Sequence, residues 1–447
     1  MKLTFYGGAG EIGGNKILLE DRDARLFLDM GVPFTFGDRF FADWLSARGR
    51  FGLRDYFALD LMPRIQGLYS AEALECTDFP HKPPAFGGIL ITHIHWDHTN
   101  HLQWVDPEIP VHMGEGTKRI LDSWATTSGS ADLGEHEYRP FRTGKELELD
   151  GVTAEPIHVD HSAPAAYGYL LHTSEGTVAY TGDLRRHGPR AEFTEEFLER
   201  AAKEKPIALI IEGTRVAPED TRQNFSEAEV LRRAVRLCND AEGKMAIATF
   251  YPRDVDRIRT FWQTAKSTGR TFVLSAKAGH LLRALAQDKH IDVPKVMEDE
   301  DVRVYFRDMD RPGKWESELR DSLKDRAVDA AWVHKNQRSV LMQLDFEHFG
   351  ELIDIRPEKG TRFIHSKSEP FEEDDPNDEV MHHWLEYFGL VYHQLHASGH
   401  LSREEVAAAI AQVNPKVVIP VHTEHPELFK EFHPHVKLPK NFSSLDL

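Results

Sequence analysis

Apolar residues in this chain fall into short runs, several of which end in histidine or an acidic residue. Residues 88–91 are apolar and mostly branched, which predicts a buried strand, and a histidine-rich stretch follows them. The same pattern recurs at residues 152–162, 178–183, 207–212 and 417–422. Functional groups are commonly carried on loops at the ends of rigid strands. The pattern therefore predicts a sandwich of sheets with a metal centre at its rim.

The densest group of ligand-type residues is H-x-H-x-D-H, formed by His93, His95, Asp97 and His98. Alternate residues of an extended segment point the same way, so His93 and His95 can reach one point. Imidazole and carboxylate groups suit Zn²⁺, Fe²⁺ or Mn²⁺. A polar loop that happens to be rich in histidine is the simplest alternative. A structural zinc site is another, although such sites more often use cysteine.

Residues 216–362 differ in composition, because helices and strands alternate there without a dense ligand cluster. Ser226 and Glu229 form a capping box that predicts a helix through Leu237. The alternation predicts an inserted α/β unit with a parallel sheet.

Residues 33–87 are rich in aromatic side chains with interspersed arginines. They form either a wall over the site, with rings that stack on bases, or an accessory helical insertion with its own small core. We favour the second interpretation.

The length and charge narrow the class of protein. A chain of 447 residues is longer than one core usually organises, so we expect two domains. The net charge of −19 argues against a wide surface for duplex nucleic acid, although a narrow channel is compatible with it. Cys76 and Cys238 are far apart, and no apolar run approaches the ~20 residues of a membrane span. We therefore predict a cytoplasmic protein with no membrane contact.

A glycine pattern near the N-terminus suggests a different cofactor. Gly8, Gly10 and Gly13 fit G-x-G-x-x-G, but short strands follow them. A dinucleotide site needs a helix at that point, so we reject a nicotinamide cofactor. Asp29 ends the second of these strands and is a candidate for orienting a histidine ligand.

The last segment returns to ligand-type residues. Residues 391–400 end in Ser398-Gly399-His400, and a second capping box, Ser402 to Glu405, begins a helix there. Free N–H groups at a helix N-terminus favour a phosphate. The residues that we predict to contact a substrate phosphate are Ser366, Ser368, His396, Ser398 and Gly399.

Together these stretches resemble the metallo-β-lactamase superfamily and, within it, the β-CASP nucleases, which include ribonuclease J. The H-x-H-x-D-H core carries the superfamily resemblance. The glycine-rich start, Thr181-Gly182-Asp183, Ser398-Gly399-His400 and Pro420-Val421-His422 carry the resemblance to the branch. It implies an α/β fold, an αββα sandwich with an inserted α/β β-CASP cap. The expected divisions are residues 1–215 for the first part of the lactamase domain, 216–362 for the cap and 363–447 for the return segment.

The resemblance also implies a set of site residues and two divalent metal ions, zinc or manganese. The first ion would be held by His93, His95 and His161, the second by Asp97, His98 and His422, with Asp183 between them. Asp97, Glu212 and His400 would be catalytic, and His400 would face the scissile phosphate.

The expected activity is hydrolysis of single-stranded nucleic acid. The resemblance favours RNA over DNA, and the sequence does not distinguish internal from terminal cleavage. Two metals can hold a hydroxide that attacks phosphorus, with Asp97 orienting it and His400 donating a proton to the leaving oxygen. One alternative is a hydrolase of a small ester, thioester or lactam, which needs neither the cap nor Ser398-Gly399-His400. Another is a non-catalytic RNA-processing subunit, although all seven implied metal ligands are present.

Overall fold

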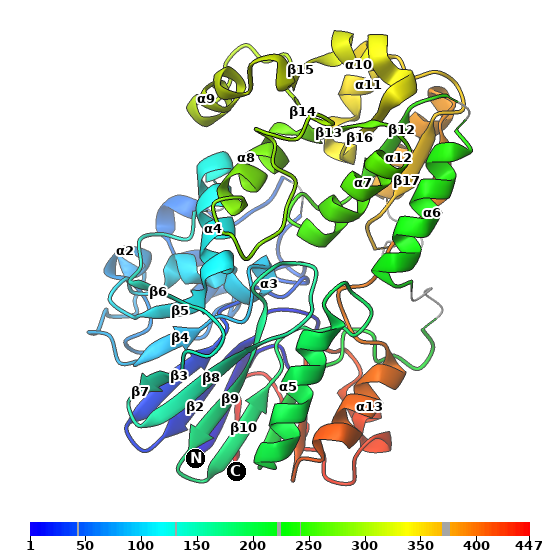
Figure 1. Cartoon of the computed structure of the whole chain (residues 1–447). Helices are drawn as coiled ribbons and strands as arrows, with labels where there is room; N and C mark the ends of the chain where they lie inside the picture. Colours follow the sequence, from blue (N-terminus) through cyan, green and yellow to red (C-terminus); the bar gives the residue numbers. More distant parts are fainter. Residues whose placement is uncertain (43, 130–131, 221–224, 242, 369–375) are drawn as a thin grey trace.

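Two β-sheets lie face to face in the lower part of Figure 1, which shows a computed structural model of the chain. The structure describes residues 1–447 except residues 43, 130–131, 221–224, 242 and 369–375. The first sheet has seven strands in the order β20-β1-β2-β3-β4-β5-β6. Their bounds are β1 Lys2–Gly7, β2 Lys16–Asp21, β3 Ala24–Leu28, β4 Gly88–Leu90, β5 Val111–Gly114, β6 Tyr138–Phe141 and β20 Ser443–Asp446.

The second sheet has six strands in the order β19-β11-β10-β9-β8-β7. Their bounds are β7 Leu147–Leu149, β8 Val152–His158, β9 Tyr167–Thr173, β10 Gly176–Tyr180, β11 Ala208–Glu212 and β19 Val418–Val421. Alternate residues of both sheets form one apolar core between them. Leu3 and Phe5 of β1, for example, share this core with Tyr169 and Leu171 of β9 and Val178 of β10.

Helices cover the outer faces of the two sheets. Phe197 of α5 (Ala191–Glu204) and Ile410 of α13 (Arg403–Val413) pack against Leu209 on the outside of the second sheet. Outside the first sheet lie α4 (Glu115–Thr127) and residues 33–87. The predicted αββα sandwich is confirmed.

The aromatic segment at residues 33–87 has little regular structure. It contains a 3₁₀ turn at Gly49–Phe51 and the short helices α1 (Arg54–Ala58) and α2 (Ala71–Leu74). Its Phe57 and Tyr69 are buried in the same core as Phe27 of the first sheet. The prediction of an insertion with its own core is therefore wrong, because these rings complete the outer layer of the sandwich.

A third sheet forms the upper unit in Figure 1, the cap, with the order β15-β14-β13-β16-β12-β17-β18. Every neighbouring pair in it is parallel. The strands are β12 Ala246–Thr249, β13 Thr271–Ser275, β14 Val302–Tyr305, β15 Ala327–Val328, β16 Val340–Gln343, β17 Arg362–His365 and β18 Val391–Gln394. The helices are α6 Glu227–Asn239, α7 Val255–Ser267, α8 Ala276–Leu285, α9 Lys314–Leu323, α10 Ala330–Asn336, α11 Leu352–Ile355 and α12 Pro376–Tyr387.

Both faces of the cap sheet are buried, as a parallel sheet requires. Ala246 and Ala248 of β12 belong to the core under α6 to α9, whereas Met245 and Ile247 belong to the core under α10 to α12. The expected boundary at residue 362 falls inside this sheet, because β17 and β18 both pair in it. A boundary drawn by sheet membership falls after Gln394. Among the helices that the structure describes, none is both long and apolar enough to cross a membrane.

Candidate metal centre

The predicted ligands meet where strands of both sheets of the sandwich end. β4 precedes the histidine-rich run, and β8, β10 and β19 lead into the loops that carry His161, Asp183 and His422. β8 ends at His158 and β10 at Tyr180, earlier than the sequence pattern predicted. His161 and Asp183 therefore lie in loops, where the backbone is free to turn each side chain inward.

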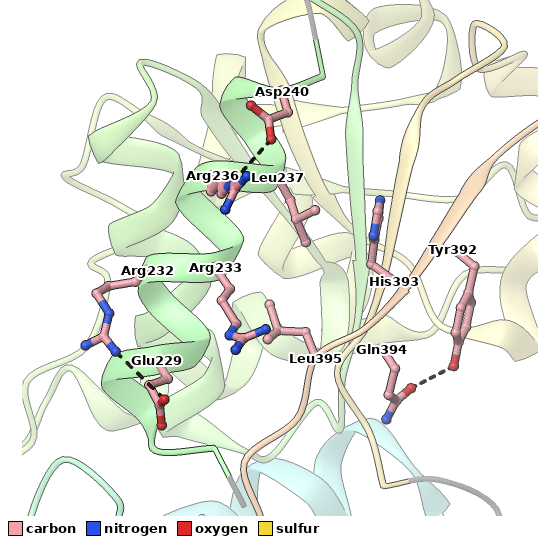
Figure 2. A pocket seen from close by; sticks show the side chains of 10 residues that line it. All are labelled: Glu229, Arg232, Arg233, Arg236, Leu237, Asp240, Tyr392, His393, Gln394 and Leu395. Atoms are coloured by element: carbon pink, nitrogen blue, oxygen red, sulfur yellow. Dashed lines mark hydrogen bonds and ion pairs between the residues drawn. The ribbon is translucent and has the colours of Figure 1, made fainter. Parts of the chain in front are cut away.

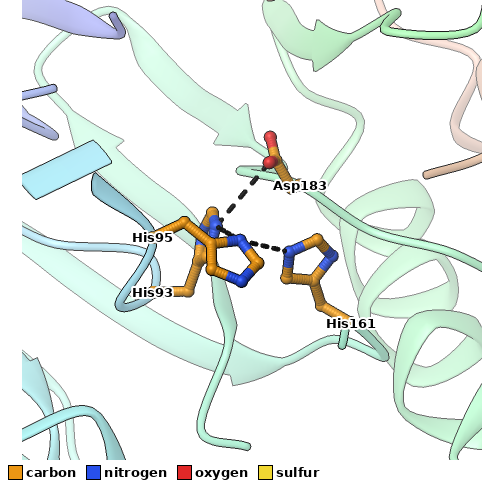
Figure 3. A group of neighbouring side chains, drawn as sticks. All are labelled: His93, His95, His161 and Asp183. Carbon is orange, nitrogen blue, oxygen red and sulfur yellow. Dashed lines mark hydrogen bonds and ion pairs between the residues drawn. The ribbon is translucent and has the colours of Figure 1, made fainter. Parts of the chain in front are cut away.

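The first group consists of His93, His95, His161 and Asp183, as Figure 3 shows. His95 Nδ1 lies 3.0 Å from His93 Nε2 and 3.1 Å from His161 Nε2. Asp183 Oδ2 is 3.6 Å from His93 Nε2. One ligand atom from each of the four residues lies within 4.8 Å of all the others.

The second group consists of Asp97, His98, His422 and again Asp183. Asp97 Oδ2 is 3.0 Å from His422 Nε2, and Asp183 Oδ2 is 3.2 Å from His98 Nε2. All four residues are buried. Asp183 therefore stands between the two groups, which is the position that the resemblance implied for it.

Hydrogen bonds to residues outside the two groups orient several of the histidine rings. His161 Nδ1 donates to the carbonyl oxygen of Gly399 at 2.7 Å, which leaves Nε2 with its lone pair facing the other histidines. His98 Nδ1 lies 2.8 Å from Asp29 Oδ2, and His422 Nδ1 lies 2.8 Å from the Thr214 hydroxyl. Such outer contacts fix the orientation of metal ligands.

Sequence reasoning found Asp29 but missed Thr92, Tyr180 and Thr214, and it predicted Gly399 only as a phosphate contact. The Thr92 hydroxyl is 3.0 Å from His93 Nδ1, and the Tyr180 hydroxyl donates to Asp29 Oδ2 at 2.6 Å. Thr92 directly precedes the histidine run, which was the one available signal. The role of Gly399 belongs to its backbone carbonyl, and a side-chain pattern cannot reveal that.

The residues present fit divalent metal ions. Burial, with the neighbouring histidines, lowers the pKa of His93 and of His161 well below the ordinary value, and burial lowers the pKa of His95 to about 4. Neutral imidazoles thus aim lone pairs at one point. In the second group, His98 Nε2 and Asp183 Oδ1 are buried without a hydrogen-bond partner among the described residues. A divalent cation would accept the imidazole lone pairs of the first group and would give these two buried atoms of the second group a bonding partner.

His400 lies at the edge of this centre, and Glu212 holds it there. His400 Nδ1 is 3.1 Å from Glu212 Oε1 and 3.9 Å from Asp183 Oδ2. Burial lowers the pKa of His400, but the Glu212 and Asp183 carboxylates outweigh it and leave the pKa raised. The His400 side chain is 22% exposed, whereas that of Glu212 is fully buried.

The predicted phosphate contacts fall into two sets. The Ser366 hydroxyl is buried, donates to the Leu395 carbonyl and accepts a hydrogen bond from Arg257, so its prediction as a phosphate contact does not fit the structure. Ser398 and Gly399 lie beside the centre, since Gly399 contacts His161 and Ser398 accepts from the His400 N–H at 3.1 Å.

Ser368 and His396 complete the predicted phosphate contacts. Ser368 is half-buried and directly precedes residues 369–375, which lie outside the described residues. His396 is also half-buried, and burial together with the Arg257 charge lowers its pKa to about 3. The His396 ring is therefore a neutral donor or acceptor rather than a cation.

A buried charge network joins this centre to the cap. Arg185 Nη2 donates to Asp256 Oδ2 of α7 at 2.7 Å and to the His161 carbonyl oxygen at 3.4 Å. Glu227 of α6 accepts from Arg185 at 3.4 Å and from Arg257 at 2.9 Å. Both arginine side chains are fully buried.

A cavity of about 800 Å³ lies elsewhere, on the outer side of the cap between α6 and β18 (Figure 2). Its lining includes Arg232, Arg233 and Arg236 of α6 and His393 and Gln394 of β18. Its lining contains none of the predicted site residues.

Comparison with known proteins shows which superfamily the chain belongs to. A family model described as a β-lactamase superfamily domain matches residues 63–250. A second, described as a Zn-dependent metallo-hydrolase RNA specificity domain, matches residues 390–431, which include His396, His400 and His422. The chain belongs to the metallo-β-lactamase superfamily.

Individual relatives show which branch of this superfamily the chain resembles. Ribonuclease J of Sinorhizobium meliloti is 25% identical over 352 residues, which cover 75% of this chain and 57% of that protein. Ribonuclease J of Pyrococcus abyssi is 22% identical over 434 residues, covering 95% of this chain and 90% of that protein. The resemblance to the β-CASP, ribonuclease J-like branch is confirmed.

A crystal structure of a protein of unknown function from Enterococcus faecalis superposes with a TM-score of 0.80 at 23% identity. The match covers 100% of this chain and 99% of that one, so the two share the whole fold.

Proposed function

We propose that this protein is a metal-dependent phosphodiesterase that hydrolyses single-stranded RNA. The observation that carries the proposal is the pair of ligand groups that share Asp183, with His400 at their edge. Ribonuclease J relatives and the RNA specificity model over residues 390–431 support RNA as the substrate. The relative from Sinorhizobium is much longer than the segment matched, so its activity enters only as support.

Two divalent ions, zinc or manganese, would be held by the ligand groups described above, with Asp183 shared. When bound, they would lower the pKa of water toward ~7 and stabilise negative charge on phosphate oxygens. The two donor sets contain only imidazole and carboxylate, which both metals accept.

Side chains of the protein orient the attacking water and donate the proton in this scheme. Asp97 Oδ2 lies 3.0 Å from His422 Nε2, and in this scheme its carboxylate accepts a hydrogen bond from the attacking water and so orients it. His400 is held by Glu212 at the edge of the centre and donates a proton to the leaving oxygen of the scissile bond. Glu212 is a positioning residue in this scheme, because it is fully buried and reaches the substrate only through His400.

The test is turnover of a 5′-monophosphorylated, end-labelled single-stranded RNA and of the matched DNA, with metal content measured on the same preparation. Release of mononucleotides indicates an exonuclease, and discrete internal fragments indicate an endonuclease. His95→Ala is the control and should abolish cleavage and weaken metal binding at the first ligand group, which contains His95. A preparation with two bound metals and no cleavage of either nucleic acid would refute the proposal and favour a hydrolase of small esters, thioesters or lactams.

The role of His400 has a separate test. His400→Gln should lower kcat about 10²–10⁴-fold, the usual contribution of a general acid, while the metal content stays unchanged. Unchanged kcat in His400→Gln, alongside an inactive His95→Ala, would remove His400 from the mechanism.

A further inference from the structure

Arg253 is a half-buried cation that forms no ion pair with a carboxylate of the described residues. It lies in the loop between β12 and α7, and its Nη1 atom is buried without a hydrogen-bond partner among the described residues. No ion pair joins it to a described carboxylate, whereas Arg257, four positions along the chain, pairs with Glu227 at 2.9 Å. Shielding part of a guanidinium from water without an anion beside it costs folding free energy, so the protein bears that cost for some other reason.

The position of Arg253 relates it to the metal centre. Burial lowers the pKa of Arg253 to about 9, and the Asp97 carboxylate opposes that shift. The Arg253 charge in turn helps to lower the pKa of His95. The guanidinium is therefore within electrostatic reach of both ligand groups, although it belongs to the cap.

Arg253 also lines a cavity of about 270 Å³. Trp96, which stands between His95 and Asp97 in the sequence, forms part of the wall, with Trp124 of α4 and the apolar Leu121. The guanidinium lies over the Trp124 ring, which holds it by a cation–π contact. The cavity thus flanks the metal ligands and combines aromatic rings with one unpaired positive charge.

These groups match one kind of ligand. Proteins bind single-stranded RNA by stacking unpaired bases on aromatic side chains, with arginine on the backbone phosphates. In a nucleotide the base and the phosphate are separated by the sugar. A base pocket for a strand under cleavage must therefore lie beside the metal centre rather than inside it.

We propose that this cavity is a nucleotide subsite, in which a base adjoining the scissile phosphate lies against Trp96 while Arg253 donates to a phosphate oxygen of the same strand. The inference rests on the proposed function, since it assigns a position to the strand that would be cleaved.

Binding is measured with a 3′-fluorescein single-stranded RNA by anisotropy, in a His95→Ala background that prevents cleavage. Arg253→Gln should weaken Kd about tenfold or more and reduce the slope of log Kd against log salt by about 0.7, the value for one phosphate contact to a single strand. Trp96→Ala should weaken Kd by a similar factor, the range of one stacked base, and leave the salt slope unchanged.

Arg236→Gln is the matched control. It removes the same charge from α6 in the outer cavity of Figure 2, where the side chain is 84% exposed. For this control variant, Kd and the slope of log Kd against log salt should stay as they are in the His95→Ala protein. Equal effects of Arg253→Gln and Arg236→Gln would mean that only the overall charge matters, and would overturn the subsite.

Thermal melting separates binding from a structural role. Arg253→Gln should keep or raise Tm, because it removes an unpaired, half-buried charge, whereas Arg257→Gln should lower Tm because it removes the partner of the buried Glu227. A loss of Tm in Arg253→Gln as large as that in Arg257→Gln would overturn the inference. If the wild-type protein cleaves RNA but Arg253→Gln binds RNA normally, the subsite alone is refuted. If RNA binds through Arg253 but the wild-type protein never cleaves it, the proposed function alone is refuted.

Discussion

Replacing Glu227 by glutamine tests whether the charge network at the base of the cap stabilises the fold. Glu227 lies in the first turn of α6 with its side chain 5% exposed. It accepts hydrogen bonds from Arg257 Nη2 at 2.9 Å, Thr260 Oγ1 at 3.0 Å and Arg185 Nη1 at 3.4 Å. Glutamine has nearly the same shape, so Glu227→Gln removes the charge and leaves two buried guanidinium groups undercompensated.

The magnitude follows from the pKa of Glu227. Burial raises this pKa, but the charges of Arg257 and Arg185 outweigh burial and lower it from 4.5 to about 2. A shift of roughly 2.5 units at 1.36 kcal/mol per unit corresponds to about 3 kcal/mol of stability at neutral pH. The cost of removing one partner of a buried ion pair, about 3–5 kcal/mol, is of the same size.

The pH dependence has a definite sign. Because the folded-state pKa of Glu227 lies below the unfolded value of 4.5, the stabilisation is present above pH 4.5 and is lost as pH falls toward 2. Urea unfolding of wild type and Glu227→Gln should differ by about 3 kcal/mol at pH 5 and by about half of that at pH 3. Burial raises the pKa of Asp256 to about 7, so this neighbouring carboxyl group is already protonated at pH 5. The pH series therefore starts at pH 5, where Asp256 no longer changes its charge.

An exposed pair supplies the control. Glu318 lies 3.7 Å from Lys314 with the side chains 61% and 91% exposed, so Glu318→Gln should leave the unfolding free energy unchanged. If Glu227→Gln unfolds at the same urea concentration as Glu318→Gln, or if its difference from wild type does not shrink with falling pH, the reasoning about the network is refuted.

Three further outcomes are expected. Asp29→Asn should weaken zinc binding about 10–100-fold in a competition titration with a chromogenic chelator, because Asp29 orients His98, and unchanged affinity would count against that role. Gly31→Ala should give little folded protein, since its Cβ would come 1.6 Å from the Asp97 carbonyl oxygen, and a normal yield with normal metal content would contradict this. Removal of metal with EDTA should lower Tm, and added zinc should restore it in proportion to the logarithm of its free concentration, whereas a Tm insensitive to chelation would argue against a metal at the clustered ligands.

The sequence supported the ligand groups because each ligand follows an apolar run, and a strand end is visible as a change from apolar to polar residues. His93, His95, Asp97 and His98 are close in the chain, so their proximity needed no knowledge of the fold. His161 and Asp183 had to be taken from the resemblance, because nothing local says which strand ends meet. The distances now bring all of them together, and their role as metal ligands stays a proposal until metal is measured.

What the sequence could not provide depends on long-range packing. Ser366 looked free to bind phosphate, but Arg257, 109 residues earlier, occupies its hydroxyl. The cap boundary was drawn too early because β17 pairs with β12, a strand far upstream. Arg253 had no local signal at all, since its lack of a partner is visible only when every neighbour is in place.

The cap and the metal centre depend on the same hydrogen bonds. The chain enters the cap near Glu227 and returns through Ala397, and Arg257 binds both, with Nη2 donating to the Ala397 carbonyl at 3.1 Å. Two residues beyond Ala397, the carbonyl of Gly399 fixes the His161 ring, whose own carbonyl accepts from Arg185. A rotation of the cap about these connections would therefore displace a predicted metal ligand by both routes. This coupling gives a physical reason for burying two arginines here: they hold the cap in one orientation relative to the predicted metal ligands.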